Sequence, residues 1–501
     1  MSYFLKAKKL DITSGESLIC LINDKDAEQF GIGLNRGDRV ELRIDDVEKP
    51  IIVVIDTTSD FVEEGQIGIY EDIWQKYGIE EGAVAEMKLF NKSEAIEAIR
   101  QKLGGKELNY EEFYVIMKDI ASGHLSETFK TLFISSGYSP GFNDDEIRYM
   151  TKALAMTGKV LKFSGITADK HSIGGVAGKG ITPIVVPIIA ANGIIVPNTS
   201  TRAVTSASAT TDMLEVIMPM SFKKEQLEEM VEKSGAFMVW GGGLDLAPAD
   251  DEIIKIQKNI GIESIDKFVS SILAKKIAQG VNTVVFDIPV GIGAKIKDEE
   301  FEEVKTKFET LGKEFDIKVI IYKREVNDID GNAVGPILEC KEFLMIYEQD
   351  KNRSLQLEED ALRMAGVLLE GVEKAKPGKG YDLAKETLLS GKAYSKFKEI
   401  VKNQGGNENI KSEDLIPGKK TYHYRAPQSG TILRTNNKRV FELARALGNP
   451  RIKEAGLYFH IEAGQKVETG DLLVTLYANS DSRIDLGQKV ALKHEMFEYA
   501  Q

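Results

Sequence analysis

The sequence is poor in cysteine and has no long apolar run, and each shortage excludes a class of protein. Its only cysteines, Cys20 and Cys340, lie far apart and match no metal or redox spacing, so we expect a reduced, cytoplasmic compartment. No apolar run approaches the roughly 20 residues that span a bilayer, and the N-terminus has no apolar signal core, so no membrane partner is expected. The histidines other than His171 show no metal-ligand spacing.

The chain is also short of positive charge. A net charge of −13 argues against non-specific binding of a nucleic acid polymer. With 42% hydrophobic and 29% charged residues, the composition is otherwise that of an ordinary globular protein, and 501 residues predict three or four domains. An acidic protein that binds an anion must gather its cations locally. Lysines and arginines among glycines therefore mark the candidate site.

The N-terminal part of the chain, residues 1–88, is rich in β-type segments and turns. Gly33–Glu41 and Gly78–Glu86 each repeat a turn followed by a strand, which predicts a small pseudo-symmetric β-barrel. Residues 89–165 follow a helical pattern instead, in which Asn109 is placed to cap a helix with an apolar face. We therefore expect a barrel domain followed by a helical domain.

Residues 166–405 alternate short β-type runs with helices. Thr283–Ile288 and Lys318–Tyr322 are rich enough in β-branched residues for buried strands, and an apolar stripe at helical spacing lies between them. Strand, helix and strand in this order predict a mainly parallel sheet with crossover helices, so the fold class is α/β. Glycine and asparagine after residue 405 suggest a linker, and residues 421–501 are predicted to form a C-terminal domain.

The most informative segment is Asp169–Pro183, which places lysines, a histidine and a serine among four glycines. Glycine lets the backbone approach a ligand and turn its N–H groups inward. Thr182 and Pro183 are suited to the N-cap and first residue of a helix, so the loop delivers donors and cations to a helix N-terminus, which is an anion site. The glycine spacing does not match a Walker loop, and an ordinary flexible loop with a solvated lysine is the alternative.

A second polar segment, Ser200–Glu215, favours the anion-site interpretation. It carries many hydroxyl groups around the single arginine Arg202, which suits the oxygens of a ribose and a phosphate. The alternative is a serine- and threonine-rich loop that caps a helix beginning near Thr211, and capping explains some of these residues.

Together the two segments resemble the thymidine/pyrimidine nucleoside phosphorylase family. The pattern Asp-Lys-His-Ser-Ile-Gly-Gly-Val from Asp169, then Ser-Thr-Arg from Ser200, continues through Leu246–Asp250 and Ser270–Lys276. The N-terminal barrel and the exact form of the first motif are most similar to the archaeal-type AMP phosphorylase branch. The resemblance implies that residues of about 248–278 join the helical domain in space, that 166–405 bind phosphate, and that 421–501 form a hammerhead-like α+β domain.

The resemblance also implies the site residues, carried over position by position. His171 would lie beside the base and the sugar. The attacking phosphate would be held by Lys170, Ser172, Thr182, Ser200 and Thr210. The nucleotide would contact Gly175, Thr201, Arg202, Ala203, Val204, Thr205, Ser206, Thr210, Ser271, Lys275 and Lys295.

Two positions depart from the patterns of the family. Where thymidine phosphorylases place an arginine that grips the pyrimidine, this chain has Ile256. Where the AMP branch has an aspartate as proton donor, this chain has Glu263, with Asp266 nearby, so the carboxyl group is kept but its reach changes by one methylene. Glu263 is the candidate catalytic acid, and Asp266 is its alternative.

The expected reaction is the phosphorolysis of AMP to adenine and ribose 1,5-bisphosphate, with inorganic phosphate as the second substrate and no metal or organic cofactor. The resemblance further implies a homodimer or a larger homo-oligomer. Three alternatives stay open: a nucleoside phosphorylase acting on thymidine or uridine, a phosphoribosyltransferase of related fold, and a non-catalytic protein that binds AMP.

Overall fold

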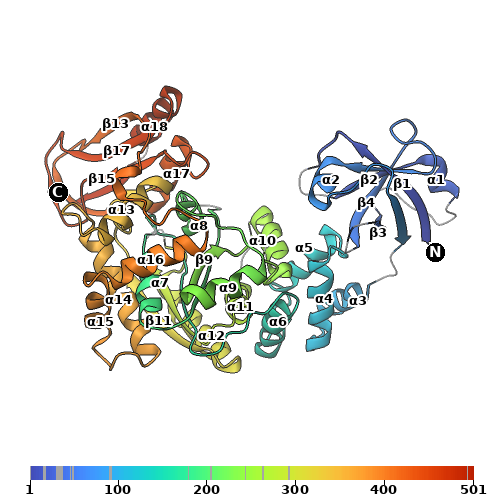
Figure 1. Ribbon diagram of the computed structural model, residues 1–501, viewed down its shortest axis with the longest axis horizontal. Coiled ribbons are helices and arrows are strands. Elements are labelled where there is room, and N and C mark those ends of the chain that lie inside the picture. Colours follow the sequence, from blue (N-terminus) through green and yellow to red (C-terminus); the bar gives the residue numbers. More distant parts are fainter. Residues whose placement is uncertain are drawn as a thin grey trace. The chain divides into compact units, whose positions relative to one another are not determined.

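The computed structural model describes residues 2–14, 18–29, 38–45, 47, 50–89, 93–178, 180–203, 206–242, 244–261, 264–291, 294–493 and 495–500. The chain divides into two compact units. The first comprises Met1–Thr157 and Pro248–Lys267, and the second comprises Gly158–Ala247 and Phe268–Gln501. In Figure 1 the first unit begins with blue strands, and the second ends with red ones.

The N-terminal part of the first unit is a closed β-barrel, as the sequence predicts. Its strands follow the order β1-β5-β2-β4-β3-β6, with buried and exposed residues alternating along β3 and β4 around an apolar core. The strands are β1 Ser2–Leu10, β2 Ile19–Asn23, β3 Arg39–Ile44, β4 Ile51–Thr58, β5 Gln66–Tyr70 and β6 Val84–Leu89. The short helices are α1 Asp24–Gln29 and α2 Glu71–Tyr77.

Helices complete the first unit. Asn109 caps α4 as predicted: its side chain accepts from the Glu112 N–H, and the Glu112 carboxylate accepts from the Asn109 N–H. A buried ion pair of 2.7 Å joins Lys102 to Glu146, and α10 packs against α4 and α5 although it comes much later in the chain. The helices are α3 Glu94–Leu103, α4 Tyr110–Ala121, α5 Glu127–Ser136, α6 Asp144–Met156 and α10 Pro248–Ile260.

The second unit is built on parallel strands. β10 lies between β11 and β7, and β8 pairs with β9; an isolated parallel bridge from Thr167 to Ile195 places β8 beside β7. Helix α12 connects β10 to β11 as the crossover predicted from the sequence. The elements are β7 Ala168–Ser172, β8 Val196–Ser200, β9 Ala236–Trp240, β10 Thr283–Val290, β11 Lys318–Glu325 and α12 Phe301–Glu314.

Two local predictions for this unit were wrong. Lys318–Tyr322 forms a strand, but only a half-buried one, because β11 is the last strand of its sheet and pairs only with β10. Helix α7 begins at Thr182 rather than after it: Ile181 already has helical backbone angles and occupies the N-cap position, so Thr182 is the first helical residue and not the cap.

An apolar core formed by α7, α14, α16 and their neighbours supports the parallel strands. The helices of this part are α7 Thr182–Ala191, α8 Thr210–Leu214, α9 Lys224–Ser234, α11 Ile265–Ala278, α13 Pro336–Tyr347, α14 Leu355–Gly371, α15 Gly380–Leu389 and α16 Lys392–Asn403, with 3₁₀ turns at Asp298–Glu300 and Ser412–Asp414. The stretch after α16 is held in place, since Gln404 bonds both backbone groups of Met238 and the Ser412 N–H donates to Glu348.

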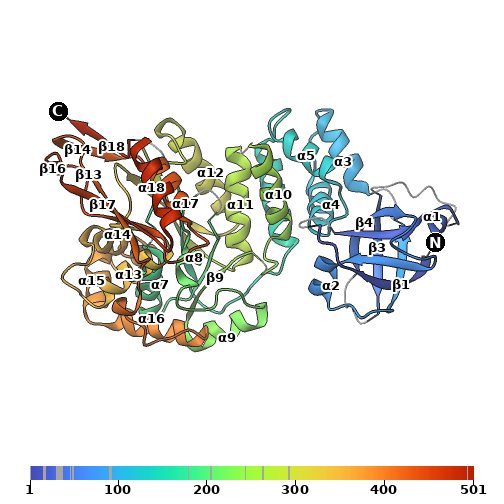
Figure 2. The ribbon, with the colours of Figure 1, turned by 90° about the horizontal axis from the view of Figure 1, so that it is seen from above.

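The C-terminal part of the second unit contains two small sheets, of order β12-β15-β17-β13 and β16-β14-β18. Helices α17 and α18 pack against the first of them (Figure 2). Its elements are β12 Ala333–Val334, β13 Lys420–Arg425, β14 Gly430–Thr435, β15 Gly456–Phe459, β16 Lys466–Val467, β17 Leu472–Ala478, β18 Phe497–Ala500, α17 Asn437–Leu447 and α18 Asp481–Lys493. Among the residues that the structure describes, no helix is both long and apolar enough to cross a bilayer.

Candidate active site

The predicted anion site lies at the carboxyl ends of the parallel strands. Lys170, His171 and Ser172 are the last residues of β7, and Ser200 is the last residue of the neighbouring strand β8. In open α/β sheets, ligands bind outside these strand ends. The sheet therefore brings Ser172 and Ser200, which are distant in the sequence, to the same edge.

The glycines after β7 are required by close backbone contacts. Gly175 has a φ of +92°, and a Cβ there would lie 2.6 Å from the backbone nitrogen of Lys295. Gly178 has a φ of +77°, and a Cβ there would lie 2.1 Å from the carbonyl oxygen of Asp330. Only glycine fits such positions. The close approach brings two predicted site residues, Gly175 and Lys295, together; the Lys295 ammonium also lies 4.0 Å from the centre of the Phe268 ring.

Lys170 and Ser172 face one another from the same strand. The Lys170 ammonium donates to the Ser172 hydroxyl at 3.1 Å, and that hydroxyl donates to the Asp287 carboxylate on β10 at 2.8 Å. Lys170 is 7% exposed, so its charge acts where solvent screening is weak. A cation and a hydroxyl at this spacing can both bind oxygens of one phosphate.

A buried ion pair fixes the start of the same strand. The Asp169 carboxylate receives the Lys276 ammonium at 2.6 Å and the Asn198 amide at 2.7 Å, which ties β7 to β8 and α11. Lys276 also donates to Gln279 at 3.1 Å. Because Asp169 is neutralised in this way, it does not oppose an anion bound by its neighbour Lys170.

His171 is surrounded by cations. Burial lowers its pKa well below the ordinary histidine value, and the charges of Lys276, Lys170, Lys275 and Lys295 lower the pKa further. The imidazole is therefore neutral at physiological pH. The ring lies edge-on to Phe286, with 6.1 Å between the centroids. A neutral histidine adds no charge of its own to this group of four lysines.

The second predicted segment follows β8. The Ser200 hydroxyl lies 2.7 Å from that of Thr211, and Thr210 is the first residue of α8. Asp212 accepts from the backbone N–H groups of Ala203 at 2.7 Å and of Ala209 at 3.0 Å, so one carboxylate shapes the loop. The start of α8 is thus capped by the Asp212 carboxylate, with Ala209 at the N-cap position, rather than by a hydroxyl of this loop.

The other predicted residues of this segment differ in their exposure and contacts. Arg202 forms two bonds to the Glu215 carboxylate and lies over Trp240, 4.8 Å from the ring centre. Thr201 is exposed, and the Ser206 hydroxyl donates to the carbonyl of Ser208 at 2.9 Å. The predicted residues Val204 and Thr205 lie outside the described residues.

Helix α11 carries the predicted base-side residues. Ser271 and Lys275 are half-buried and one turn apart on it, as their spacing predicts. Asp266 is in the first turn of the same helix, and Ile256 is buried on α10. The candidate acid Glu263 lies outside the described residues, so its role stays a prediction.

The buried side chains behind the site were not assigned a role from the sequence. Asp169, Lys276 and Asp287 are almost fully buried, and Arg324 binds Asp287 from the next strand, β11. A charged residue within an otherwise apolar strand, as in Val-Val-Phe-Asp-Ile, is the signal that could have indicated Asp287, because an unpaired charge is not tolerated at such a position.

Comparisons with known proteins identify the lineage. Residues 164–327 match the a/b domain of the glycosyl transferase family, and residues 433–494 match the pyrimidine nucleoside phosphorylase C-terminal domain. The chain is 40% identical to the AMP phosphorylase of Thermococcus sibiricus over 96% of its own length and 94% of that protein. The chain belongs to the AMP phosphorylase family. It is also 36% identical to AMP phosphorylase 1 of Archaeoglobus fulgidus, over 97% of this chain and 95% of the relative.

Solved structures agree on the fold. Anthranilate phosphoribosyltransferase from Thermus thermophilus superimposes with a TM-score of 0.51 at 17% identity, covering 62% of this chain and 99% of that one. The family resemblance and the α/β fold class inferred from the sequence are both confirmed. The glycosyl transferase match spans β7 to β11, which is the part of the chain that carries Lys170, Ser172 and Lys295.

Proposed function

We propose that the protein cleaves AMP with inorganic phosphate to give adenine and ribose 1,5-bisphosphate. The observation that carries the proposal is the gathering of Lys170, Ser172, Lys275 and Lys295 around a neutral His171 at the carboxyl ends of the strands. Such a cluster suits two anions, a phosphate and a nucleotide. The relatives that match nearly the whole chain bear the name AMP phosphorylase.

The phosphate is assigned to the β7 side of the site. In the proposed arrangement it is held by the Lys170 ammonium, by hydroxyls at the ends of β7 and β8, and by the first residues of α7 and α8. The residues are Lys170, Ser172, Thr182, Ser200 and Thr210. Three of these lie within two residues of a strand end, and the other two begin helices, whose free N–H groups favour anions.

The chemistry then follows from charge. A phosphate oxygen bonds to C1′ of the ribose while the bond from C1′ to the base breaks and its electron pair goes to adenine. The ribose becomes positively charged in the transition state, which the bound phosphate stabilises. Adenine needs a proton as it leaves, and Glu263 is proposed to supply it. Neutral His171 would lie against the base and sugar without adding charge.

Base specificity is assigned to α11 and to the residue that replaces the pyrimidine-gripping arginine. Ile256 is buried and apolar, so it offers no hydrogen bond to a pyrimidine carbonyl. Ser271 and Lys275 remain as polar groups for the base. Arg202 and its neighbours, residues 201–206, are proposed to contact the nucleotide. A cytoplasmic location and assembly into a homodimer or larger oligomer belong to the same proposal.

Product analysis tests the proposal. The purified protein is incubated with AMP, adenosine or thymidine, each with and without inorganic phosphate, and free base and sugar phosphate are quantified. We expect adenine and ribose 1,5-bisphosphate from AMP only when phosphate is present. Faster release of thymine from thymidine than of adenine from AMP at equal concentrations, or base release without phosphate, would contradict it.

A further inference from the structure

A fully buried carboxylate lies directly behind the hydroxyl proposed to bind phosphate. Asp287 on β10 is the register partner of Ser172 on β7, is 0% exposed, and accepts the Ser172 hydroxyl proton at 2.8 Å. Two consequences oppose phosphate binding. The negative charge repels an anion, and the hydroxyl turns its proton away from the site.

Arg324 counteracts both the charge of Asp287 and the inward orientation of the Ser172 hydroxyl proton. From β11, its Nε donates to Asp287 Oδ1 at 3.3 Å and its Nη2 to Asp287 Oδ2 at 3.3 Å. The guanidinium therefore offsets the charge of Asp287. The Ser172 hydroxyl can also rotate toward a ligand without leaving Asp287 unsatisfied, because Arg324 still donates a hydrogen bond to each of its carboxylate oxygens.

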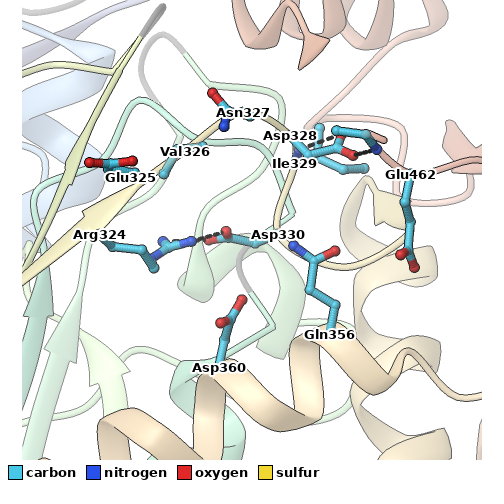
Figure 3. A pocket seen from close by; sticks show the side chains of 11 residues that line it. Arg324, Glu325, Val326, Asn327, Asp328, Ile329, Asp330, Gln356, Asp360 and Glu462 are labelled. Atoms are coloured by element: carbon cyan, nitrogen blue, oxygen red, sulfur yellow. Dashed lines mark hydrogen bonds and ion pairs between the residues drawn. The ribbon is translucent and has the colours of Figure 1, made fainter. Parts of the chain in front are cut away.

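Asp330 holds the guanidinium in place. It accepts from Nη1 and Nη2 of Arg324, the second bond being 3.1 Å long, and Figure 3 shows Arg324 directed at it. Burial alone would lower the pKa of Arg324, but the charges of Asp330 and Asp287 outweigh it and raise that pKa, so the cation is permanent. The fork shape of arginine permits this double pairing.

The far side of Arg324 opens into a pocket of about 290 Å³ that does not suit an anion. Among the described side chains that line it, Arg324 is the only cation, against five acids: Glu325, Asp328, Asp330, Asp360 and Glu462 (Figure 3). Burial raises the pKa of Asp360 to about 6, with Asp330 and Asp287 adding to the shift and Arg324 opposing it. The guanidinium is thus committed to carboxylates, and its effect on phosphate is indirect.

We propose that Arg324 is a positioning residue of the proposed phosphate site: it offsets the charge of Asp287 and frees the Ser172 hydroxyl to donate to phosphate. The proposal rests on the proposed binding of phosphate at Lys170 and Ser172. The path runs through three adjacent parallel strands, from Ser172 on β7 to Asp287 on β10 and Arg324 on β11.

The test measures binding of radiolabelled inorganic phosphate by equilibrium dialysis, without nucleotide. Arg324→Met should weaken phosphate binding roughly 10- to 100-fold, the effect on a monoanion of an uncompensated charge roughly 6–10 Å away at an effective dielectric constant of about 20. In the double variant Arg324→Met/Asp287→Asn, part of the affinity should return, since the uncompensated charge nearest Ser172 is gone, although Asp330 has also lost its partner. In kinetics, KM for phosphate should rise in Arg324→Met while KM for AMP changes less than about threefold.

Matched variants separate this role from a general loss of structure. Arg353 forms a similar pair with Glu358 at 2.6 Å and donates to the carbonyl of Asp350 at 3.2 Å. Neither partner belongs to the proposed phosphate site, so Arg353→Met should leave phosphate binding unchanged. Asp330→Asn keeps the pair of Arg324 with Asp287, so this variant should bind phosphate at least as tightly as the wild type does. The same variant tests the proposal if Arg324→Met does not fold. Arg324→Lys, which keeps the charge but not the fork, should lie between wild type and Arg324→Met.

Three results would overturn the inference: unchanged phosphate affinity in folded Arg324→Met, no recovery in the double variant, or a more than threefold loss in Asp330→Asn. Failure of the proposed function gives a different result. A wild type that binds phosphate but does not cleave AMP would contradict the reaction and leave the role of Arg324 intact.

Discussion

Cations at the proposed phosphate site are arranged in two layers of residues. Lys170, Lys275 and Lys295 lie around His171, whereas Lys276 and Arg324 lie behind the site and are paired with buried carboxylates. An acidic protein can bind anions in this way, because the inner cations offset the charge of the inner acids and so weaken their repulsion of the ligand.

The proton donor is the residue on which the proposed reaction depends most. Glu263→Gln keeps the size and hydrogen-bonding shape of the side chain but cannot supply the proton, so turnover of AMP should fall about 10²–10⁴-fold with little change in AMP binding. Glu263→Asp should retain part of the activity, because the shorter acid is the residue of the family. Steady-state rates at saturating AMP and phosphate measure the effect.

Asp266→Asn is the matched control for this prediction, since Asp266 lies in the first turn of α11. It should leave turnover within about threefold of wild type. A large loss in Asp266→Asn together with a nearly silent Glu263→Gln would assign the proton to Asp266 instead.

At the scale of elements, helix α11 carries both proposed site residues and residues that stabilise the fold. Its later turns carry Ser271, Lys275 and Lys276, whereas Lys267 in its first turns donates to the carbonyl of Ile134 at 2.6 Å and lies over the rings of Phe133 and Phe142. Burial lowers the pKa of Lys267 to about 7. The helix thus contains a lysine that is half neutral in the folded protein at that pH.

This lysine makes stability depend on pH. Between pH 7 and the ordinary lysine value near 10.4, the unfolded chain binds a proton that the folded chain does not, so the free energy of unfolding rises with pH by up to about 1.4 kcal/mol per unit. Lys267→Met should remove this contribution. Urea unfolding of both proteins at pH 7, 8 and 9 should show the free energy of unfolding rising more steeply with pH in the wild type than in Lys267→Met. An equal dependence on pH in the two proteins would contradict the prediction.

Lys130 is a buried lysine that, unlike Lys267, is described with carboxylate partners, so it serves as a comparison for the effect of Lys267→Met. It is as buried as Lys267 but pairs with Glu127 and Glu252 at 3.0 and 3.1 Å. Lys130→Met should therefore lower the free energy of unfolding at pH 7 by only about 1 kcal/mol or less from lost pairing, because Glu252 keeps Lys255 at 2.6 Å and Glu127 is exposed.

At the scale of the whole molecule, the barrel is set apart from the chemistry by its own core. Its main core cluster lies in the strands β1–β6 and helix α2 with its following turn, and Leu10, Leu21 and Val62 form a smaller cluster. Its sequence carries no counterpart of the lysine–glycine loop. Arg39 of β3 bonds the carbonyl of Gly123, which ties the barrel to the helices of the first unit. We infer that the barrel serves assembly.

Truncation tests this inference. A chain that starts at Leu89 should lose any assembly larger than a dimer, because the barrel surface is removed, while phosphate binding persists, because the strands of the second unit are intact. Light scattering measures the assembly size, and equilibrium dialysis measures binding. A truncated protein of full assembly size would contradict the role.

Features that depend on local patterns could be predicted from the sequence alone. Alternation of apolar residues, glycine turns and caps such as Asn109 act over a few residues, and so the barrel, the capped helix α4 and the parallel arrangement of β10 and β11 were predictable. The motif from Asp169 onward also indicated the family, which the relatives that match nearly the whole chain confirm.

Which distant residues meet became known only from the tertiary structure. Strand order places Ser172 beside Asp287 and Arg324, and no local pattern encodes a register between strands that are more than a hundred residues apart. The half-burial of β11 likewise follows from its place at the end of the sheet rather than from its composition. The strand register and the burial of β11 have the same physical reason. Both depend on which elements pack beside a strand, and the residues of the strand itself do not specify those neighbours.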